Sequence, residues 1–356
     1  MSIVLRSFSK INLGLAIGPT RSDGFHQLAT LYQTIDAHDR VRVEAVPADA
    51  THIALTSSDE RVPTDARNTA WKIAALALKE WNISAKVHIH IEKRLPVQGG
   101  LGAGSANAVA ALIGLERELA AHGIPPLPGA KKRDIAAGVG SDVPLFLVGG
   151  SVLGMGRGEI VSPLTDFPVM ECVLALPEIG VSTPEAFRNW DRLHPGSTAA
   201  TAADNPSLTT SSGSSKLDTL SQTLTVTLGE SHSSGVFSLE EDLAGDTGSP
   251  SSIFDGGKNP LSALVRTGIE NDFEEVVFPK YPFLGEIRRV LAYSLHPEHA
   301  AHYAALSGSG SALFGLYETS EAAEAAEVRL AELGVRSLRA KTLPRDRYWR
   351  TMITES

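Results

Sequence analysis

The chain has 356 residues, a length that accommodates two domains of ordinary size. Its hydrophobic fraction of 42% and charged fraction of 21% are those of a soluble globular protein. The formal net charge of −9 argues against a protein whose main task is to hold nucleic acid, since such binding rests on basic residues that neutralise phosphates. We therefore expect no nucleic-acid partner, although this charge is compatible with a local pocket for one nucleotide.

Cys172 is the single cysteine of the sequence, so it has no partner for an internal disulfide, as is usual in a reducing compartment. Its apolar neighbours predict a buried, unreactive thiol. The N-terminus has no charged-then-apolar signal pattern, and no apolar run approaches the ~18 residues of a membrane span. We expect a cytoplasmic protein without membrane contact that acts as a monomer or weak homodimer.

The first part of the chain carries strand and helix patterns in turn. Arg21–His26 contains Asp-Gly and predicts a turn. Asn68 is a favourable N-cap for a helix that ends near Trp81. Apolar residues at helical spacing over 108–119 predict a second helix, ended by Gly123. Apolar or alternating runs predict strands over 3–5, 11–17, 41–43, 53–55 and 87–91.

The later part mixes the same patterns. Pro144 biases Val143 toward an extended conformation. Helices are predicted over 131–137, over 184–190 with Thr183 as the cap, over 284–295 and over 322–333. Strands are predicted over 145–148, 170–176 and directly after 307–311. Strands and helices without regular β-α-β spacing indicate an α+β fold, which we divide into domains at 1–165 and 166–356.

Residues 195–258 differ in composition from the rest of the chain. Ser, Thr, Gly and Asp dominate this stretch, so it buries too little apolar surface to offset its ordering entropy. We predict a flexible insertion, with a brief ordered element over 217–228.

The most informative stretch is Pro96–Ala108, which follows an alternating strand pattern and opens a helix pattern. Glycines allow positive φ and close approach of a ligand, and successive N–H groups at a helix start form a cradle for an anion. No Gly-Lys-Ser/Thr ends the loop, and its glycines do not follow G-x-G-x-x-G, so it matches neither common nucleotide motif. The stretch predicts a nucleotide-phosphate site of another kind.

Phosphoryl transfer needs a phosphate cradle, Mg²⁺ near the phosphates, a base for the alcohol proton and a cation. The glycine loop, Ser105, Asp142 and Lys10 offer these four functions. Each also has an ordinary structural interpretation: Lys10 as a solvated edge residue, Asp142 as a turn former and the loop as a bare strand-to-helix connection. The sequence pattern alone leaves both interpretations open.

In combination these segments resemble the GHMP family of small-molecule kinases, which includes galactokinase, homoserine kinase and mevalonate kinase. Pro96–Ala108 resembles the family's phosphate loop, and Ser307–Ser311 resembles its third, glycine-rich motif, here Gly308, Ser309 and Gly310. The resemblance implies two domains: an N-terminal one like domain 2 of ribosomal protein S5 and a ferredoxin-like C-terminal one. It also implies the cofactors ATP and Mg²⁺.

Within this family, the chain resembles one branch in particular. The enzymes of that branch phosphorylate the 2-hydroxyl of a cytidine-diphosphate-linked methylerythritol in the non-mevalonate isoprenoid pathway. The segments that carry it are 10–13, 21–26, 92–96, 140–144, 156–159 and 271–274. The resemblance implies that Asp142 takes the hydroxyl proton beside Lys10. It implies a substrate pocket formed by Asn12, Phe25, His26, Thr183 and Phe187. It implies ATP contacts from Asn68, Lys93, Pro96, Gly99, Gly100, Leu101, Gly102, Ala103, Gly104, Ser105 and Ala106, with Ser105 as the metal ligand.

Some positions depart from the family pattern. Ala103 replaces a glycine, and a positive φ there would cost on the order of 1 kcal/mol. Ala106 replaces a serine and removes one potential phosphate or metal ligand. Two alternatives stay open: a GHMP kinase for another small alcohol such as homoserine or mevalonate, and a non-catalytic nucleotide-binding protein on the same scaffold.

Overall fold

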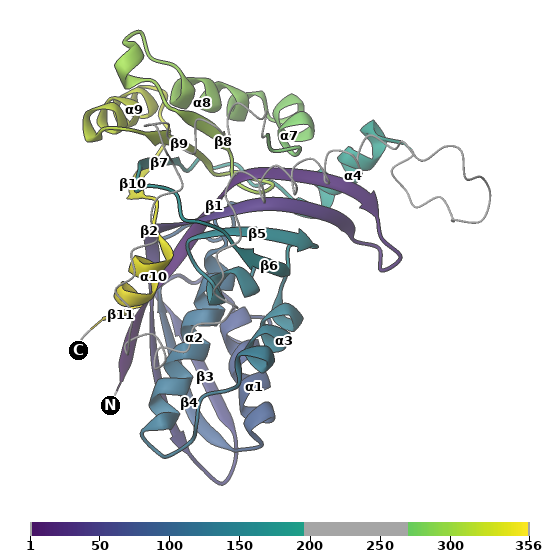
Figure 1. Cartoon of the computed structure of the whole chain (residues 1–356), viewed down its shortest axis with the longest axis vertical. Coiled ribbons are helices and arrows are strands. Elements are labelled where there is room, and N and C mark those ends of the chain that lie inside the picture. Colours follow the sequence, from purple (N-terminus) through teal and green to yellow (C-terminus); the bar gives the residue numbers. More distant parts are fainter. Residues whose placement is uncertain (1, 196–269, 355–356) are drawn as a thin grey trace, which may run out of the picture.

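The computed structural model describes residues 2–195 and 270–354. Two sheets with their helices form two lobes, and the long strands β1 (Ile3–Thr20) and β2 (His26–Pro47) run from one lobe to the other (Figure 1). The predicted insertion 195–258, with its element over 217–228, lies outside the described residues apart from Pro195.

The first sheet has seven strands. Its main path has the order β11-β1-β2-β4-β3, and β5 pairs with β2 and with β6. The β3–β4 pair is parallel, and the other described pairs of this sheet are antiparallel. The remaining bounds are β3 His52–Ser57, β4 Ala85–Glu92, β5 Ser151–Gly156, β6 Ile160–Pro163 and β11 Ile353–Thr354.

The second sheet has four antiparallel strands in the order β10-β7-β9-β8. Its strands are β7 Glu171–Ala175, β8 Tyr303–Leu306, β9 Leu313–Tyr317 and β10 Ser337–Lys341. Helices α8 (Pro282–Ala292) and α9 (Ser320–Glu332) contact this sheet. Antiparallel strands with helices on one face give the α+β organisation predicted from the sequence.

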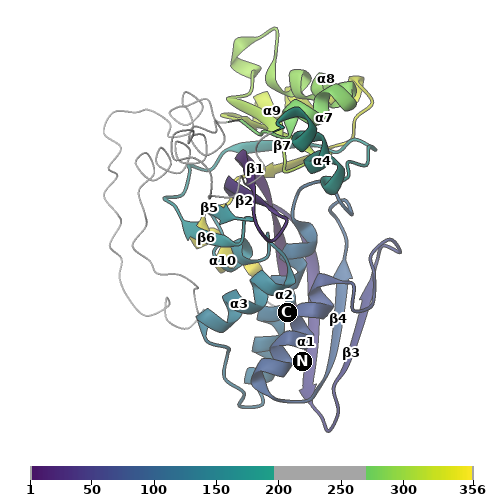
Figure 2. The ribbon, with the colours of Figure 1, turned by 90° about the vertical axis from the view of Figure 1, so that its right-hand side faces the viewer.

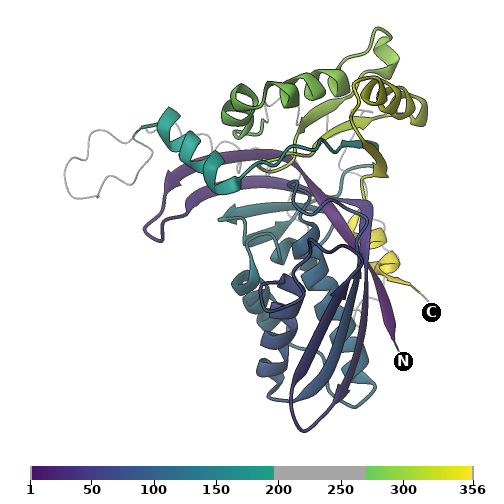
Figure 3. The same cartoon turned by 180° about the vertical axis from the view of Figure 1, so that it is seen from behind.

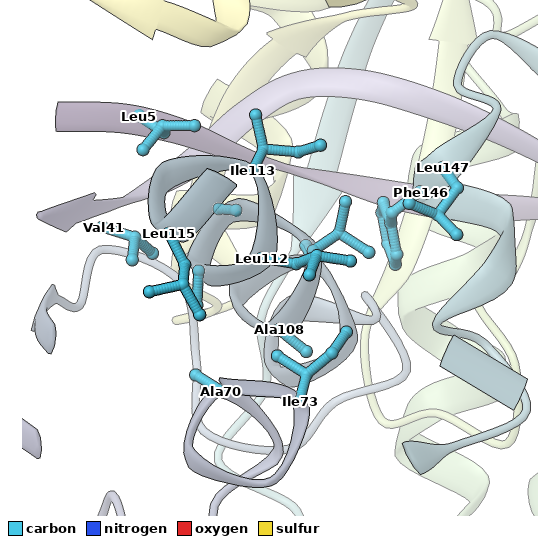
Figure 4. Packing of buried hydrophobic residues seen from close by; sticks show 14 of the residues in the cluster. Leu5, Val41, Ala70, Ile73, Ala108, Leu112, Ile113, Leu115, Phe146 and Leu147 are labelled. Carbon is cyan, nitrogen blue, oxygen red and sulfur yellow. The ribbon is translucent and has the colours of Figure 1, made fainter. Parts of the chain in front are cut away.

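Helices α1 (Thr69–Trp81), α2 (Ala103–Ala120) and α3 (Gly129–Val139) gather on one face of the first sheet (Figure 2). The other described helices are α4 Thr183–Leu193, α7 Glu274–Lys280, α10 Arg345–Met352 and the 3-10 turns η1 Pro144–Leu147 and η2 Pro297–His299. Figure 4 shows the first core, in which α2 packs against the sheet, α1 and η1. The buried side chains that these elements contribute include Leu5, Val41, Ala70, Ile73, Leu112, Ile113, Leu115, Phe146 and Leu147.

The end of the chain returns to the first lobe. Strand β11 pairs with β1, with Val4 opposite Thr354, so both ends of the described chain lie close together (Figure 3). Helix α10 contributes Tyr348 and Trp349 to the first core. Residues 345–354 therefore belong structurally to the first sheet, although the division at 165/166 groups them with the second.

The predicted strand over 145–148 is wrong. Residues 144–147 form the 3-10 turn η1, and Val143 is helical, with φ −67° and ψ −43°. Pro144 occupies the first helical position, where its missing N–H costs nothing. Val143 and all four residues of η1 are buried, so packing in the core overrides the local preference of a residue that precedes proline.

Two other predictions need correction. Thr183 is the first residue of α4 rather than its cap, because Ser182 occupies the cap position. The two short strands predicted over 3–5 and 11–17 are parts of the single strand β1, which bends at register shifts instead of ending. The prediction of a buried thiol is confirmed: Cys172 is 0% exposed, and burial raises its pKa. Across the described ranges, no helix combines the length and apolar character needed to cross a membrane.

Candidate functional site

The glycine-rich loop lies between β4 and α2 and concentrates positive backbone angles. Gln98 has φ 72°, Gly99 138°, Gly100 80° and Gly102 68°. Ala103 is the first residue of α2 and does not have a positive φ. The positive φ lies one residue earlier, at Gly102, and a glycine adopts it without strain. No side chain caps α2, which leaves its first N–H groups directed out of the helix end.

A cavity of about 470 Å³ opens on this loop, and residues 96–105 form one of its walls. Asn68 and Lys93 line it too, but their polar ends bind within the protein. The Asn68 side chain accepts from Ala70 N at 2.8 Å and donates to Pro63 O at 2.8 Å. Ala106 is 3% exposed, belongs to the first core and does not line the cavity. Its lack of a hydroxyl therefore removes nothing from the cavity wall.

Lys10 connects the loop with the other candidate groups. Its side chain is 3% exposed. Nζ donates to Asn12 Oδ1 at 2.6 Å and to Gly100 O at 2.7 Å, and it lies 3.4 Å from Asp142 Oδ2. Burial lowers the pKa of Lys10, and the charge of Asp142 opposes this effect. Lys10 is thus buried and contacts Asn12, Gly100 and Asp142, so it is not the solvated edge residue of the alternative interpretation.

Asp142 has its two carboxylate oxygens on different partners. Tyr32 Oη donates to Oδ1 at 2.9 Å, while Oδ2 faces Lys10. Burial, followed by the charge of Asp142, raises the pKa of Tyr32 well above its ordinary value, so the phenol remains a donor. Gly158 has φ 105°, and a Cβ there would lie 2.6 Å from Tyr32 Oη. A glycine at this place keeps room for the Tyr32–Asp142 pair, and the carboxylate side chain remains 33% exposed.

The third glycine-rich motif supports the phosphate loop from the second lobe. Ser307 Oγ donates to Gly100 O at 3.0 Å, and Ala312 N donates to Gly99 O at 3.1 Å. Asn271 holds this motif through hydrogen bonds of 2.8 Å to Leu306 O and to Gly308 O. The segments that resemble the family's motifs at 96–108, 271–274 and 307–311 therefore meet in one place.

The predicted substrate residues gather at the tip of the β1–β2 hairpin and on α4, which lies beside it (Figure 3). His26 stacks on Phe187, with ring centroids 4.9 Å apart and planes inclined by 3°. His26 Nε2 lies 3.1 Å from Asp191 Oδ1, and Nδ1 lies 3.1 Å from Gly18 O. Phe25 is 51% exposed, and the Arg157 guanidinium lies 4.9 Å from its ring centre.

Two further predicted residues connect this region to the centre. Thr183 Oγ1 lies 2.7 Å from Ser309 Oγ of the third motif. Asn12 is buried beside Lys10, and its amide donates to Thr30 Oγ1 at 2.8 Å. Asn12 and Thr183 thus contact residues at the two glycine motifs, while His26 and Phe187 stack on each other within the pocket that the resemblance implies.

The metal prediction rests on Ser105, whose half-buried side chain lines the 470 Å³ cavity. Within the ranges 2–195 and 270–354, no group of three or more His, Cys, Asp or Glu side chains is placed to hold a metal ion. Mg²⁺ binds nucleotide enzymes through phosphate oxygens and one or two protein ligands, so this donor set suits an ion carried mainly by the nucleotide.

Sequence patterns missed three residues of the site. Tyr32 looks like an ordinary apolar strand residue, yet its hydroxyl contacts Asp142. Gln98 adopts positive φ without being a glycine. Asp39 is completely buried and bonds to Lys93 at the edge of the loop. Asp39 stands between His38 and Arg40 in a polar part of the strand, so the local sequence gives no signal that this carboxylate is buried.

Comparison with known proteins gives concordant results. The model described as GHMP kinases N terminal domain matches residues 68–150, and the model described as GHMP kinases C terminal matches 258–336. A 4-diphosphocytidyl-2-C-methyl-D-erythritol kinase of Solibacter usitatus is 34% identical over 88% of this chain and 80% of its own length. The enzyme of the same name from a Synechococcus strain is also 34% identical, over 88% of this chain and 84% of its own length.

Solved structures show the same relationship. A crystal structure of 4-(cytidine 5'-diphospho)-2C-methyl-D-erythritol kinase superposes with a TM-score of 0.62 and 26% identity, covering 95% of this chain and 98% of that one. Homoserine kinase from Cytophaga hutchinsonii superposes with a TM-score of 0.65 at 17% identity over 96% of this chain and 95% of its own, which shows the shared fold. The chain belongs to the GHMP kinase family, whose members use ATP as the phosphoryl donor.

Proposed function

We infer that the protein transfers the γ-phosphoryl group of ATP to the 2-hydroxyl of 4-diphosphocytidyl-2-C-methyl-D-erythritol, giving the 2-phosphate and ADP. The observation that carries this proposal is Lys10, whose one ammonium contacts both the phosphate loop at Gly100 and the carboxylate of Asp142. A donor phosphate on the loop and an acceptor hydroxyl at Asp142 are thereby held next to each other. Relatives named for this reaction cover most of the chain.

In the proposed reaction, the substrate hydroxyl gives its proton to Asp142 while its oxygen forms a bond to the γ-phosphorus. The bond between that phosphorus and the bridging oxygen breaks, and ADP leaves with this electron pair. Lys10 holds the carboxylate beside the loop and stabilises the negative charge that develops there. Tyr32 fixes the carboxylate orientation through Oδ1, which leaves Oδ2 free to face the hydroxyl beside Lys10.

The nucleotide would occupy the cavity lined by residues 96–105, with its phosphates at the start of α2. Mg²⁺ bound to the phosphates supplies charge neutralisation, and Ser105 is the protein group that would contribute an oxygen to it. Asn68 and Lys93 line the same cavity, but their polar ends are already bound within the protein.

For the cytidine end we propose the pocket formed by His26, Phe187 and Thr183, with Asn12 nearer the reacting hydroxyl. The rings of His26 and Phe187 are stacked on each other in this structure. A cytosine that stacks on Phe187 therefore displaces the His26 ring from that face. Phe187 lies on α4, whose contacts with the hairpin tip are side-chain contacts. The pocket therefore opens by moving side chains rather than by breaking the sheet.

The experiment that tests this function is a coupled ADP-release assay on the purified protein with the cytidylyl substrate, homoserine and mevalonate as acceptors. We expect ATP-dependent turnover with the cytidylyl substrate alone. Cytidine diphosphate should inhibit in competition with the acceptor and not with ATP, because its base would occupy the His26–Phe187 pocket. Turnover with homoserine or mevalonate instead would contradict the assignment of substrate.

Tyr32→Phe should lower kcat by about 10–10²-fold and leave the KM for ATP unchanged. The variant removes the hydrogen bond that Tyr32 donates to the carboxylate of Asp142. A hydrogen bond to a charged acceptor is worth roughly 1.5–3 kcal/mol, and without it the carboxylate is no longer held with Oδ2 toward the hydroxyl. The measurement is kcat, with the KM for ATP, from the coupled ADP-release assay.

Tyr348→Phe is the matched control for this variant. Tyr348 is also fully buried, and its hydroxyl donates to Phe146 O at 2.7 Å in the first core. It should lower thermal stability to a similar degree and leave kcat unchanged. Equal kcat values for Tyr32→Phe and wild type would refute the role given to Tyr32.

A further inference from the structure

Asp39 of β2 has a completely buried carboxylate with four hydrogen-bond donors around it. Its Oδ1 accepts from the backbone N–H of Arg94 at 2.8 Å and of Leu95 at 2.9 Å. Its Oδ2 accepts from Lys93 Nζ at 2.5 Å and from Asn107 Nδ2 at 3.2 Å. Charged hydrogen bonds of this kind hold their partners more firmly than neutral ones.

These donors lie on both sides of the phosphate loop. Lys93, Arg94 and Leu95 immediately precede Pro96, where the loop begins, and Asn107 lies in α2, which follows it. Ser7 of β1 donates to Asn107 Oδ1 at 2.6 Å and is the cross-strand partner of Asp39. One carboxylate therefore ties the entry and the exit of the loop to the same point of the first sheet.

The pair also determines what Lys93 can offer to a ligand. The side chains of Lys93 and Asp39 are 5% and 0% exposed, so the ammonium is withdrawn from the cavity that the residue lines. A buried ion pair is costly to desolvate and is retained where it specifies an arrangement. Here the ion pair specifies how the segment between β4 and α2 is arranged.

We propose that Asp39 is a positioning residue for the nucleotide: it sets the shape of the phosphate loop from behind without contacting the ligand. This inference rests on the proposed use of the 470 Å³ cavity for ATP. A carboxylate that accepts from both flanks fixes the distance between the last strand residue and the helix start, and the loop glycines then present their N–H groups at a set spacing.

Asp39→Asn tests the proposal. An amide oxygen can still accept from Arg94 and Leu95, but the amide nitrogen then faces the donors of Lys93 and Asn107. We expect the Kd for ADP, measured by calorimetry without any alcohol, and the KM for ATP to rise by about 10–10²-fold. The KM for the alcohol should stay unchanged. The calorimetric arm does not depend on the identity of the alcohol, so failure of the proposed substrate leaves this test intact.

Glu116→Gln is the matched control, because Glu116 is a buried carboxylate on the same helix α2. It accepts from Lys132 Nζ at 3.2 Å and from Leu127 N at 2.9 Å, away from the loop. The variant should lower thermal stability and leave ADP affinity unchanged. An equal loss of ADP affinity in both variants would reduce Asp39 to a general contributor to stability and overturn the proposal.

Lys93→Met tests the arrangement from the other partner and serves also if Asp39→Asn is too unstable to purify. It keeps the aliphatic wall of the cavity and leaves Asp39 without its cation. We expect the two effects on ADP affinity to be non-additive, with the double variant no weaker in binding than either single one. Additive losses would mean that the ammonium contacts the nucleotide directly, and an unchanged ADP affinity in Asp39→Asn would refute the positioning role.

Discussion

Asp142→Asn should retain its fold and lose ATP-dependent phosphorylation by about 10²–10⁴-fold, the usual contribution of a general base. An amide has the shape of the carboxylate but accepts no proton from a hydroxyl. The variant also removes the negative charge that opposes the effect of burial on the pKa of Lys10. The measurement is kcat from the coupled ADP-release assay at saturating concentrations of both substrates.

Two further measurements separate chemistry from folding in this variant. Lys10 keeps Asn12 Oδ1 and Gly100 O as partners, and the Asp142 side chain is 33% exposed, so the unfolding free energy should change by about 1 kcal/mol or less. The Kd for ADP should equal that of wild type because the cavity that holds the nucleotide does not include Asp142. Near wild-type turnover would refute the assignment of Asp142 as the base.

Local chemistry was sufficient to predict several elements of the first lobe. Asn68 caps α1 as expected, with its side chain accepting from Ala70 N. The alternation over 87–91 corresponds to β4, and the glycine loop does join this strand to a helix. Each of these features depends on residues close together in the sequence, where capping preference and periodicity act directly.

Tyr32 shows why the site itself was harder to predict. Continuous pairing from Thr20 opposite His26 would place Thr34 opposite Asn12. Register shifts between Asn12 and Gly14 and between Ile17 and Thr20 instead place Tyr32 there. A bulge changes which side chain faces the site, and nothing in the local composition announces it.

Long-range contacts account for the other omissions. Lys93 lines the cavity, but its ammonium binds Asp39, which lies 54 positions earlier in the chain. The family resemblance places residues near a ligand because it compares motifs, and it does not report how each polar atom is satisfied. The partner of each polar atom depends on which donors and acceptors the fold brings together.

Gly100→Ala should cause the second large loss of activity, a fall in kcat/KM for ATP of about 10²-fold. Gly100 has φ 80°, and a Cβ on it would lie 1.9 Å from Ser307 O and 2.9 Å from Ser307 C. Both are backbone atoms of the third motif, so a rotamer change cannot relieve the overlap. The loop and the third motif must move apart, which displaces Gly100 O from Lys10 and from Ser307 Oγ.

This loss has two components that separate variants resolve. Positive φ at an alanine costs roughly 1–2 kcal/mol by itself, and overlap with the third motif adds about 1–3 kcal/mol. Gly123→Ala isolates the first component, since Gly123 has φ 77° and nothing lies within 4 Å of the added Cβ. It should lower the melting temperature slightly and leave the KM for ATP unchanged.

The ADP affinities of Gly100→Ala and Gly123→Ala show whether the loss comes from the contact with the third motif or from the positive φ alone. If contact between the phosphate loop and the third motif holds the nucleotide site together, Gly100→Ala should lose ADP affinity and Gly123→Ala should not. Should Gly100→Ala bind ADP as tightly as wild type, the second lobe would have no part in shaping the phosphate site. The Ser307–Gly100 contact would then serve only to hold the two lobes together.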